Sequence, residues 1–356
     1  MSEPSYGRLS ALPLTVEKCD VAAREQNSNA WTRRTTVVRL LGLGQVGAGE
    51  DVNYDSDEQL RFQATWQKAV PDALQSQLPI RSTLGGFLQA LNRVALFDGV
   101  EGRTDMRMYR RWAFESAALA LALQQSETSL SEVLGRESKP VRFARSMGLA
   151  KTDPIGALRT WLDAEPELRF KLDYSEHWDD QVVAQLSDLG VVDVVDLKGL
   201  YRGSFQGPPA SREGYERVVQ GLPDVWIEDP EINEETAAVL MPAIDRITWD
   251  ANLHSVQDLW QVQTEPKVVN IKPSRFGTLE SLLAVYDYCE ARGIRCYGGG
   301  QFELDVGRRH IQALASLFHP DMPNDVAPVD YHLSKPAAGL PRSPLPVEDC
   351  FAGTGF

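Results

Sequence analysis

The chain has 356 residues, of which 43% are hydrophobic and 24% charged, as is ordinary for a globular protein with room for one large domain and a smaller one. Its net charge of −14 argues against a nucleic-acid partner or an anionic membrane surface, so an anionic ligand would need a local positive centre. No apolar run approaches the roughly 18 residues of a membrane span, and the polar first ten residues lack the apolar core of a signal peptide.

Four cysteines occur, and their spacing is not that of a metal site. They are Cys19, Cys289, Cys296 and Cys350. This usage predicts buried free thiols in a reducing compartment, and we expect a cytoplasmic protein.

A glycine-rich stretch follows the first clear strand, which we predict over Thr35–Leu41. Gly42–Gly47 matches the dinucleotide-binding pattern G-x-G-x-x-G, which requires a helix to begin at the glycines. The residues that follow carry no apolar stripe at helical spacing. This favours a hairpin with a second strand over Val46–Glu50, and the alternative is an NAD-dependent oxidoreductase built on Gly42–Gly47.

Helical patterns fill the rest of the N-terminal part. Residues 57–97 are predicted to be helical with interruptions at Pro71 and Pro79, and Asp105–Gln125 is the clearest helix, with a face of small residues suited to close packing. Ser129–Gly135 is predicted to be a short capped turn. Lys139-Pro140 then marks a domain boundary.

From Val141 onward, short apolar segments alternate with amphipathic helices, as parallel βα units do. Helices are predicted over Asp179–Leu189, Leu279–Arg292 and Arg308–Phe318. An eighth strand is expected near Val326–Tyr331, and the Pro- and Gly-rich tail is expected to run back over the first domain. The predicted strands are Val141–Met147, Leu168–Asp173, Val191–Asp196, Val225–Glu228, Arg246–Asp250, Val268–Lys272 and Ile294–Gly298.

Four consecutive predicted strands each end on an ionisable residue. These residues are Asp196, Glu228, Asp250 and Lys272. The carboxyl ends of parallel barrel strands face one mouth, where such barrels carry out their chemistry, so we expect the three acids to converge there. Carboxylates with room for water suit Mg²⁺, and the absence of histidine and cysteine from these strand ends argues against zinc.

Two lysines accompany the predicted metal site. Lys272 ends one strand, and Lys171 lies on the strand before Asp196. A divalent cation disfavours the charged form of a nearby lysine, which lowers its pKa toward the range that a general base needs. The metal would stabilise a developing enolate oxygen as a Lewis acid.

These motifs together resemble the enolase superfamily, most nearly its muconate lactonizing enzyme-like branch. The resemblance implies an N-terminal α+β capping domain over residues 1–140, a modified TIM barrel of the (β/α)₇β type over 141–333, and a tail over 334–356 that packs back on the cap. In chain order, the segments that carry it are GQVGAGE, RRWAFESAALALAL, SLSEVLG, FKLD, VVDLKG, WIEDP, TWDANLHSVQDL, NIKPSRFGTLESLL and GGGQFELDVGR.

The resemblance also assigns roles by position. Asp196, Glu228 and Asp250 look like the Mg²⁺ ligands, and Lys272 looks like the acid/base of the sixth strand. Lys171 falls in the second-strand K-x-K motif, from which this chain departs: either Asp173 replaces the second lysine or Arg169 replaces the first, and the strand alternation does not decide between them.

Two further positions depart from the family pattern, and a second group of candidate residues is assigned to substrate binding or left without a role. Lys198 stands where the family often has the asparagine of Asp-x-Asn, and Asp-Ala replaces Asp-Glu after the fifth strand. This second group of candidates comprises Asp173, Lys198, Asn270 and Gln301.

The expected reaction is removal of the proton α to a carboxylate of a small-molecule substrate, with an enolate intermediate that leads to elimination or epimerisation. By analogy, the loop Arg24–Trp31 of the cap would form part of the substrate pocket. We expect a homo-oligomer with no nucleic-acid or membrane partner. A catalytically silent barrel with a binding or structural role is the other alternative, since the second strand is altered.

Overall fold

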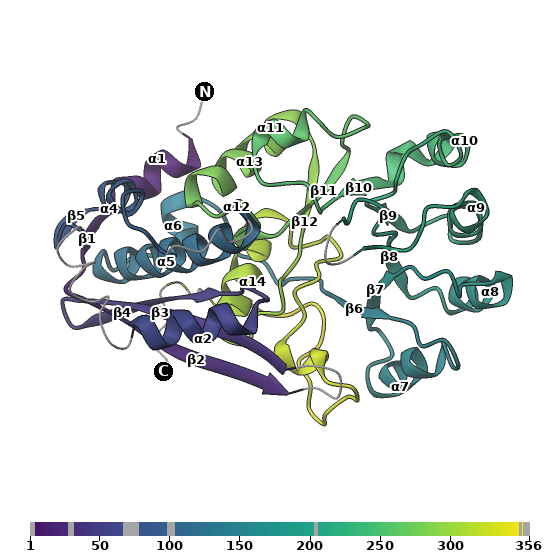
Figure 1. The fold of residues 1–356 in the computed structure, drawn as a ribbon, viewed down its shortest axis with the longest axis horizontal. Helices are drawn as coiled ribbons and strands as arrows, with labels where there is room; N and C mark the ends of the chain where they lie inside the picture. Colours follow the sequence, from purple (N-terminus) through teal and green to yellow (C-terminus); the bar gives the residue numbers. More distant parts are fainter. Residues whose placement is uncertain are drawn as a thin grey trace.

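The computed structural model describes residues 4–27, 32–66, 78–97, 104–202, 206–348 and 351. Two domains lie side by side, with the long helix α5 and the sheet β2–β3–β4 in one and a parallel sheet ringed by helices in the other (Figure 1). Within the described part of the chain, no helix is both long and apolar enough to cross a bilayer.

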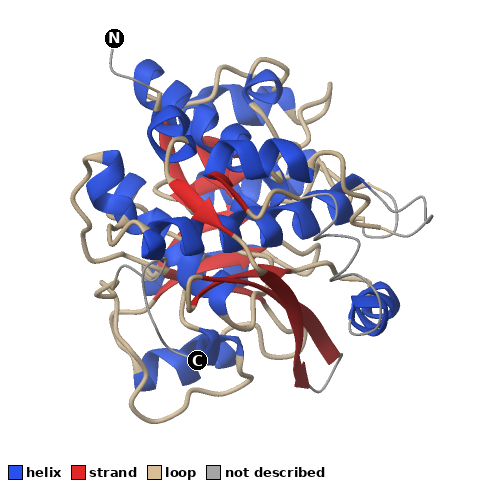
Figure 2. Cartoon of the chain, turned by 90° about the vertical axis from the view of Figure 1, so that its left-hand side faces the viewer, coloured by secondary structure: helices blue, strands red, loops and turns tan. Residues whose placement is uncertain are grey.

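The first domain is a helical layer packed on a three-stranded antiparallel sheet, and Figure 2 shows the sheet below the helices. The predicted interrupted helix over 57–97 corresponds to α2 and α4, but the short strand β5 before α4 was not predicted, and Pro71 lies outside the described residues. The elements are α1 (Ser5–Ser10), β1 (Pro13–Thr15), β2 (Lys18–Asn27), β3 (Thr32–Gly42), β4 (Gln45–Asp51), α2 (Ser56–Trp66), β5 (Arg81–Thr83), α4 (Leu84–Leu91), α5 (Thr104–Gln125) and α6 (Leu130–Leu134).

The glycine-rich stretch is a hairpin, as predicted. Strands β3 and β4 pair antiparallel and are joined by Leu43 and Gly44, both with positive φ (53° and 76°). A nucleotide-binding helix does not follow, so the Rossmann alternative is wrong. The later glycines serve packing, because a Cβ at Gly49 would lie 2.0 Å from the carbonyl oxygen of Ala113 on α5.

The second domain is a barrel of seven parallel strands in sequence order. Two isolated bridges, Phe143 to Asn324 and Gly299 to Asp325, join its two edges and close the ring. The expected eighth strand near Val326–Tyr331 was therefore placed too late, since residues 329–332 form a 3₁₀ turn. The strands are β6 (Ala144–Gly148), β7 (Arg169–Asp173), β8 (Val192–Asp196), β9 (Trp226–Glu228), β10 (Ile247–Trp249), β11 (Val268–Ile271) and β12 (Arg295–Gly298).

Helices cover the outside of this barrel (Figure 1). The predicted capped turn at Ser129 is a capping box that closes on Glu132, and Gly190 and Gly293 end α8 and α13 in the left-handed conformation. The helices are α7 (Gly156–Ala164), α8 (Asp180–Leu189), α9 (Arg212–Gly221), α10 (Ala237–Leu240) with the 3₁₀ turn η1 (Met241–Arg246), α11 (Val256–Leu259), α12 (Pro273–Phe276), α13 (Leu279–Arg292), α14 (Val306–Phe318) and the 3₁₀ turn η2 (Val329–His332).

Buried polar residues join the first domain to the barrel. Glu50, at the end of the hairpin, accepts the backbone N–H groups of Leu304, Asp305 and Gly307 at 2.7, 3.0 and 2.9 Å, where α14 begins. Unpaired N–H groups and the helix dipole make such a terminus a favourable place for a carboxylate. Glu50, the last residue of the GQVGAGE segment, therefore positions the first domain over the barrel mouth.

The tail contacts the barrel in its described part. Leu345 pairs with Val141, Arg342 forms an ion pair with Glu165 at 3.1 Å, and Phe351 stacks on His310 of α14. Its predicted packing on the first domain stays a prediction.

Cys19, Cys289 and Cys296 are free and buried, as expected, while Cys350 lies outside the described residues.

Candidate active site

The ionisable residues that the sequence singled out lie at one end of the barrel. Asp173, Asp196 and Glu228 are direct neighbours across β7, β8 and β9, because the parallel register pairs Asp173 with Asp196 and Asp196 with Glu228. Asp250 and Lys272 follow directly after β10 and β11. Side chains far apart in the sequence thus share one level of the barrel mouth.

A cavity of about 1090 Å³ lies above this level, between the barrel and the first domain. The first domain contributes Asn53, Tyr54, Met106 and Tyr109 to its wall. The barrel contributes most of the predicted site, with Lys171, Asp173, Asp196, Lys198, Lys272 and Gln301. The cavity is large enough for a ligand of several functional groups. Of the predicted pocket loop Arg24–Trp31, residues 28–31 lie outside the described residues.

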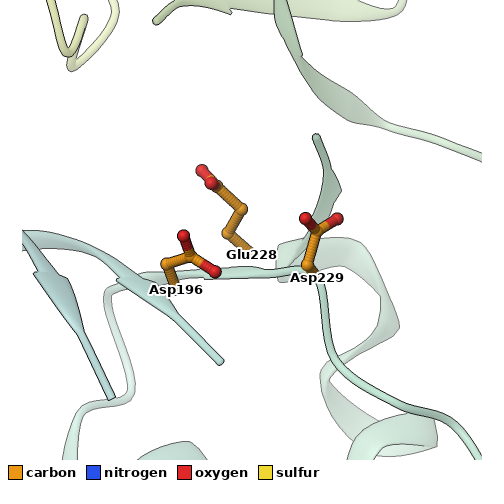
Figure 3. Close-up of side chains that lie close together, drawn as sticks. All are labelled: Asp196, Glu228 and Asp229. Carbon is orange, nitrogen blue, oxygen red and sulfur yellow. The ribbon is translucent and has the colours of Figure 1, made fainter. Parts of the chain in front are cut away.

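Among the described residues, Asp196, Glu228 and Asp229 form a buried acidic group and offer oxygens within 4.8 Å of one another (Figure 3). Asp229 was missed by the sequence reasoning, although it directly follows Glu228 in WIEDP. Its two oxygens accept the backbone N–H groups of Asp250 and Ala251, both at 2.8 Å. Asp229 therefore fixes the backbone of Asp250 and Ala251, at the start of the loop after β10.

Each of the three predicted metal ligands has a basic partner. Lys171 donates from Nζ to Glu228 and lies 3.9 Å from Asp196. Lys198 bridges Asp196 and Asp173, at 2.7 and 3.0 Å. Lys198 has a φ of 52°, which is rare for a residue with a side chain and turns its backbone back toward Asp196.

Asp250 forms a separate ionic cluster with two cations. Lys272 Nζ lies 2.8 Å from one carboxylate oxygen, and Arg275 Nη1 lies 2.7 Å from the other. Tyr201 donates to Asp250 at 3.3 Å. Arg275 was also missed by the sequence reasoning, but its place three residues after Lys272, on the short helix α12, is a signal that could have identified it.

Burial and charge set the protonation of these groups. Burial raises the pKa of Glu228 to about 7, against the opposing effect of Lys171. Burial also disfavours the charged form of Asp196, but Lys198 and Lys171 outweigh it and lower the pKa of Asp196. The pKa of Lys171 lies well above its ordinary value because Glu228 outweighs the effect of burial. The lysines are therefore positively charged counter-ions of the acids in this arrangement.

The remaining candidates lie around this centre. Asn270 on β11 donates to Glu228 at 3.3 Å, and Tyr297 on β12, which was not predicted, also donates to Glu228. Gln301 follows β12 and accepts from Tyr54 of the first domain at 2.9 Å. Glu228 is thus enclosed by three donors, Lys171, Asn270 and Tyr297, at the centre of the barrel mouth.

Two models of one protein family match the two domains of the chain. A model described as the C-terminal domain of DUF8230, a domain of unknown function, matches residues 137–333, and its N-terminal counterpart matches residues 7–133. The chain belongs to the DUF8230 family.

Two curated relatives of this DUF8230 protein are named for a synthase and for a racemase. An o-succinylbenzoate synthase of Geobacillus stearothermophilus is 25% identical over 222 residues, which are 60% of this chain and 58% of the relative. An N-succinylamino acid racemase of an Amycolatopsis species is 28% identical over 235 residues, or 61% of this chain and 60% of the relative. These matches thus span less than two thirds of the length of each relative.

Solved structures agree on the fold over nearly the whole chain. A member of the enolase superfamily from Listeria innocua superposes with a TM-score of 0.66 at 17% identity, covering 95% of this chain and 94% of that one. The predicted capping domain with a modified TIM barrel is confirmed, and so is the resemblance to the muconate lactonizing enzyme-like branch.

Proposed function

We propose that this DUF8230 protein removes the proton α to a substrate carboxylate, and that the resulting enolate leads to elimination or epimerisation. The observation that carries the proposal is the group of buried acids with two lysines at the carboxyl ends of the barrel strands. Lys171 contacts Glu228, Lys272 contacts Asp250, and both lysines line a large cavity together with Asp196. The names of the two curated relatives support the same reaction class.

The carboxylates fit a hard divalent cation. Asp196 and Glu228 already face one cationic nitrogen, that of Lys171, so their oxygens converge on a point where positive charge is stabilised. We infer that Asp196, Glu228 and Asp250 would hold Mg²⁺, while Asp229 keeps Asp250 in position. Bound Mg²⁺ would act as a Lewis acid that stabilises the negative charge developing on the substrate carboxylate.

Two lysines then divide the proton transfers. Lys171 comes from β7 and Lys272 follows β11, with three strands between them in the sheet, so they would approach a ligand from different sides of the cavity. One lysine, in its neutral form, would accept the α-proton, and the other, as an ammonium group, would return a proton for epimerisation or balance the enolate charge during elimination. Bound Mg²⁺ would favour the neutral form of the first lysine, because a nearby cation disfavours a second positive charge. On the second barrel strand, Lys171 is a better candidate for the catalytic group than Asp173. The Lys171 ammonium group already contacts Glu228, while Asp173 pairs with Lys198.

The direct test is α-proton exchange in D₂O. N-succinyl amino acids are the first substrates to try, since one relative is named for racemising them. We expect Mg²⁺-dependent deuterium incorporation at the α-carbon, and Lys272→Ala should lower it by more than ~10²-fold, the lower end for general acid–base catalysis. Lys267→Ala, an exposed lysine just before β11, is the matched control and should keep the exchange. Wild-type turnover in Lys272→Ala would rule the mechanism out.

One observation favours a second candidate, a barrel that binds ligands without catalysis. The three predicted metal ligands are all engaged by basic side chains of the chain itself, namely Lys171, Lys198, Lys272 and Arg275. Calorimetry separates the two functions, because the catalytic proposal requires Mg²⁺ binding that is weakened in Asp196→Asn and Glu228→Gln. A cytoplasmic location and a homo-oligomeric state stay predictions.

A further inference from the structure

A turn after β8 brings a tyrosine across the mouth of the barrel. Lys198 has a left-handed φ of 52°, and the N–H of Tyr201 donates to the carbonyl of Lys198 at 3.3 Å, so the chain turns back over the strand ends. The hydroxyl of Tyr201 thereby reaches Asp250 at 3.3 Å, although Asp250 lies 49 residues further along the chain and two strands away. Tyr201 also lines the cavity, where a ligand can contact it.

Contacts on both sides fix the position of this turn. The N–H of Gly199 donates to the carbonyl of Asp229 at 2.8 Å, next to the acid cluster. Arg202 donates to the carbonyls of Gly199 and Tyr201 at 2.6 and 2.9 Å. The ammonium nitrogen of Lys198 lies 5.2 Å from the centre of the Tyr201 ring, which is a cation–π arrangement. The phenol is therefore held in place by the chain itself, as a group that acts on a substrate requires.

The hydroxyl of Tyr201 shares its acceptor with the proposed base. Lys272 Nζ lies 2.8 Å from Oδ2 of Asp250, and Tyr201 donates to the same oxygen. The 3.3 Å contact of the hydroxyl is longer than the roughly 2.5–3.0 Å that is usual for an O–H···O hydrogen bond, so Asp250 is a weak acceptor for it. The phenol also keeps its proton at neutral pH, because its ordinary pKa of about 10 is raised further by burial. A protonated donor thus lies beside Lys272 with a bond that it can exchange for a better one.

We infer that Tyr201 is a catalytic hydrogen-bond donor that stabilises the negative charge developing on the reacting carboxylate of the substrate. Tyr201 and Lys272 meet at one oxygen of Asp250, so charge stabilisation and proton removal would take place next to each other. The hydroxyl keeps its proton throughout and only changes its acceptor, from Asp250 to the substrate. A donor that is already in position pays little reorganisation when the charge appears. The inference rests on the proposed function, since it assigns a further residue to that reaction.

Tyr201→Phe tests the donor, because it removes the hydroxyl and keeps the ring. Deuterium exchange at the α-carbon should fall about 10²-fold in kcat, the lower end for the loss of one such donor. KM should stay near its wild-type value, since the bond strengthens only as the charge develops. Tyr288→Phe loses a hydroxyl that contacts the exposed Trp260 instead, and this control should keep the wild-type rate. Wild-type exchange in Tyr201→Phe would overturn the assignment.

Binding of an enolate mimic tests the same donor without turnover. A hydroxamate in place of the reacting carboxylate resembles the enolate, and calorimetry with Mg²⁺ should compare N-succinylalanine with its hydroxamate. The wild type should bind the hydroxamate about 10²-fold more tightly, the lower end for transition-state analogues. Tyr201→Phe should lose most of this preference and keep its affinity for the carboxylate. A preference that survives in Tyr201→Phe would contradict the inference.

A merely structural role of the hydroxyl predicts a different pattern. If Tyr201 only held Asp250 in place, Tyr201→Phe would change the affinity for Mg²⁺ alone and weaken the carboxylate and the hydroxamate equally, which would reject the donor. The proposed function can also fail by itself. A hydroxamate preference that depends on Tyr201, without α-proton exchange in any substrate, would keep the donor and reject the reaction. Wild-type exchange that persists in Tyr201→Phe would reject the donor and keep the reaction.

Discussion

The ammonium nitrogen of Lys198 lies 2.7 Å from Oδ2 of Asp196, two residues before it in the chain. The backbone N–H of Lys198 also donates to Oδ1 of the same carboxylate at 2.9 Å. Both oxygens of a proposed metal ligand are thus engaged by a single residue, at a position where the family that the sequence resembles often has asparagine.

Replacing Lys198 with asparagine should therefore raise the affinity for Mg²⁺. The change removes a buried cation that competes for Asp196, and we expect a gain of about tenfold, or ~1.4 kcal/mol. Isothermal titration calorimetry measures it, with the exposed Lys151→Asn as the matched control. An affinity equal to that of the wild type would show that Lys198 does not compete at this site.

Asp229→Asn should destabilise the barrel. The carboxylate accepts two backbone N–H groups, those of Asp250 and Ala251, and an amide in its place can accept only with its one oxygen. One buried donor then loses its acceptor, which costs about 1–3 kcal/mol. Urea denaturation measures the loss, and Asp224→Asn, an exposed change nearby, should have little effect. Equal stability of the two variants would contradict the positioning role.

Glu50→Gln tests the link between the domains. Glu50 accepts from Thr35 at 2.6 Å and from three backbone N–H groups at the start of α14, and glutamine loses one oxygen and the charge that the helix dipole favours. We expect the free energy of unfolding to fall by about 1–3 kcal/mol, so that unfolding begins at a lower denaturant concentration. The exposed Glu167→Gln is the control. Limited proteolysis should also become faster in Glu50→Gln if the domains separate more readily.

The buried His319 should make the fold sensitive to acid. Burial lowers its pKa to about 4, and the ring contacts Asn324 at 2.6 Å and Tyr286 at 3.0 Å. The unfolded chain binds the proton near pH 6.5 and the folded chain does not, so stability falls as the pH drops from about 6.5 to 4, by ~1.4 kcal/mol per pH unit.

His319→Gln should remove this contribution. The stability difference between wild type and variant should be largest at pH 7 and shrink as the pH falls toward 4, measured by urea denaturation at several pH values. His177→Gln, at an exposed position, should leave the wild-type pH profile unchanged. Parallel profiles of wild type and His319→Gln would contradict the buried, neutral state of the ring.

Much of the architecture was predictable because its signals are local. Apolar runs of strand length that end in a charge identified β8 to β11, and the parallel arrangement then determined that Asp196 and Glu228 would be neighbours. The hairpin was predictable because a dinucleotide motif needs a helix that the residues after Gly47 do not support. Strand periodicity fixes which face a side chain occupies and which end of the barrel it reaches.

Which partners these side chains meet was decided only by the tertiary structure. The left-handed φ of Lys198 directs it back to Asp196, and Asp229, next to a predicted ligand, turns to the backbone of Asp250 instead. Asn53 and Gln301 lie together because Arg33 donates to both of their backbone carbonyls, and its contact with Gln301 spans 268 residues of the chain. Such contacts depend on how two domains pack, and no pattern within either domain encodes their approach.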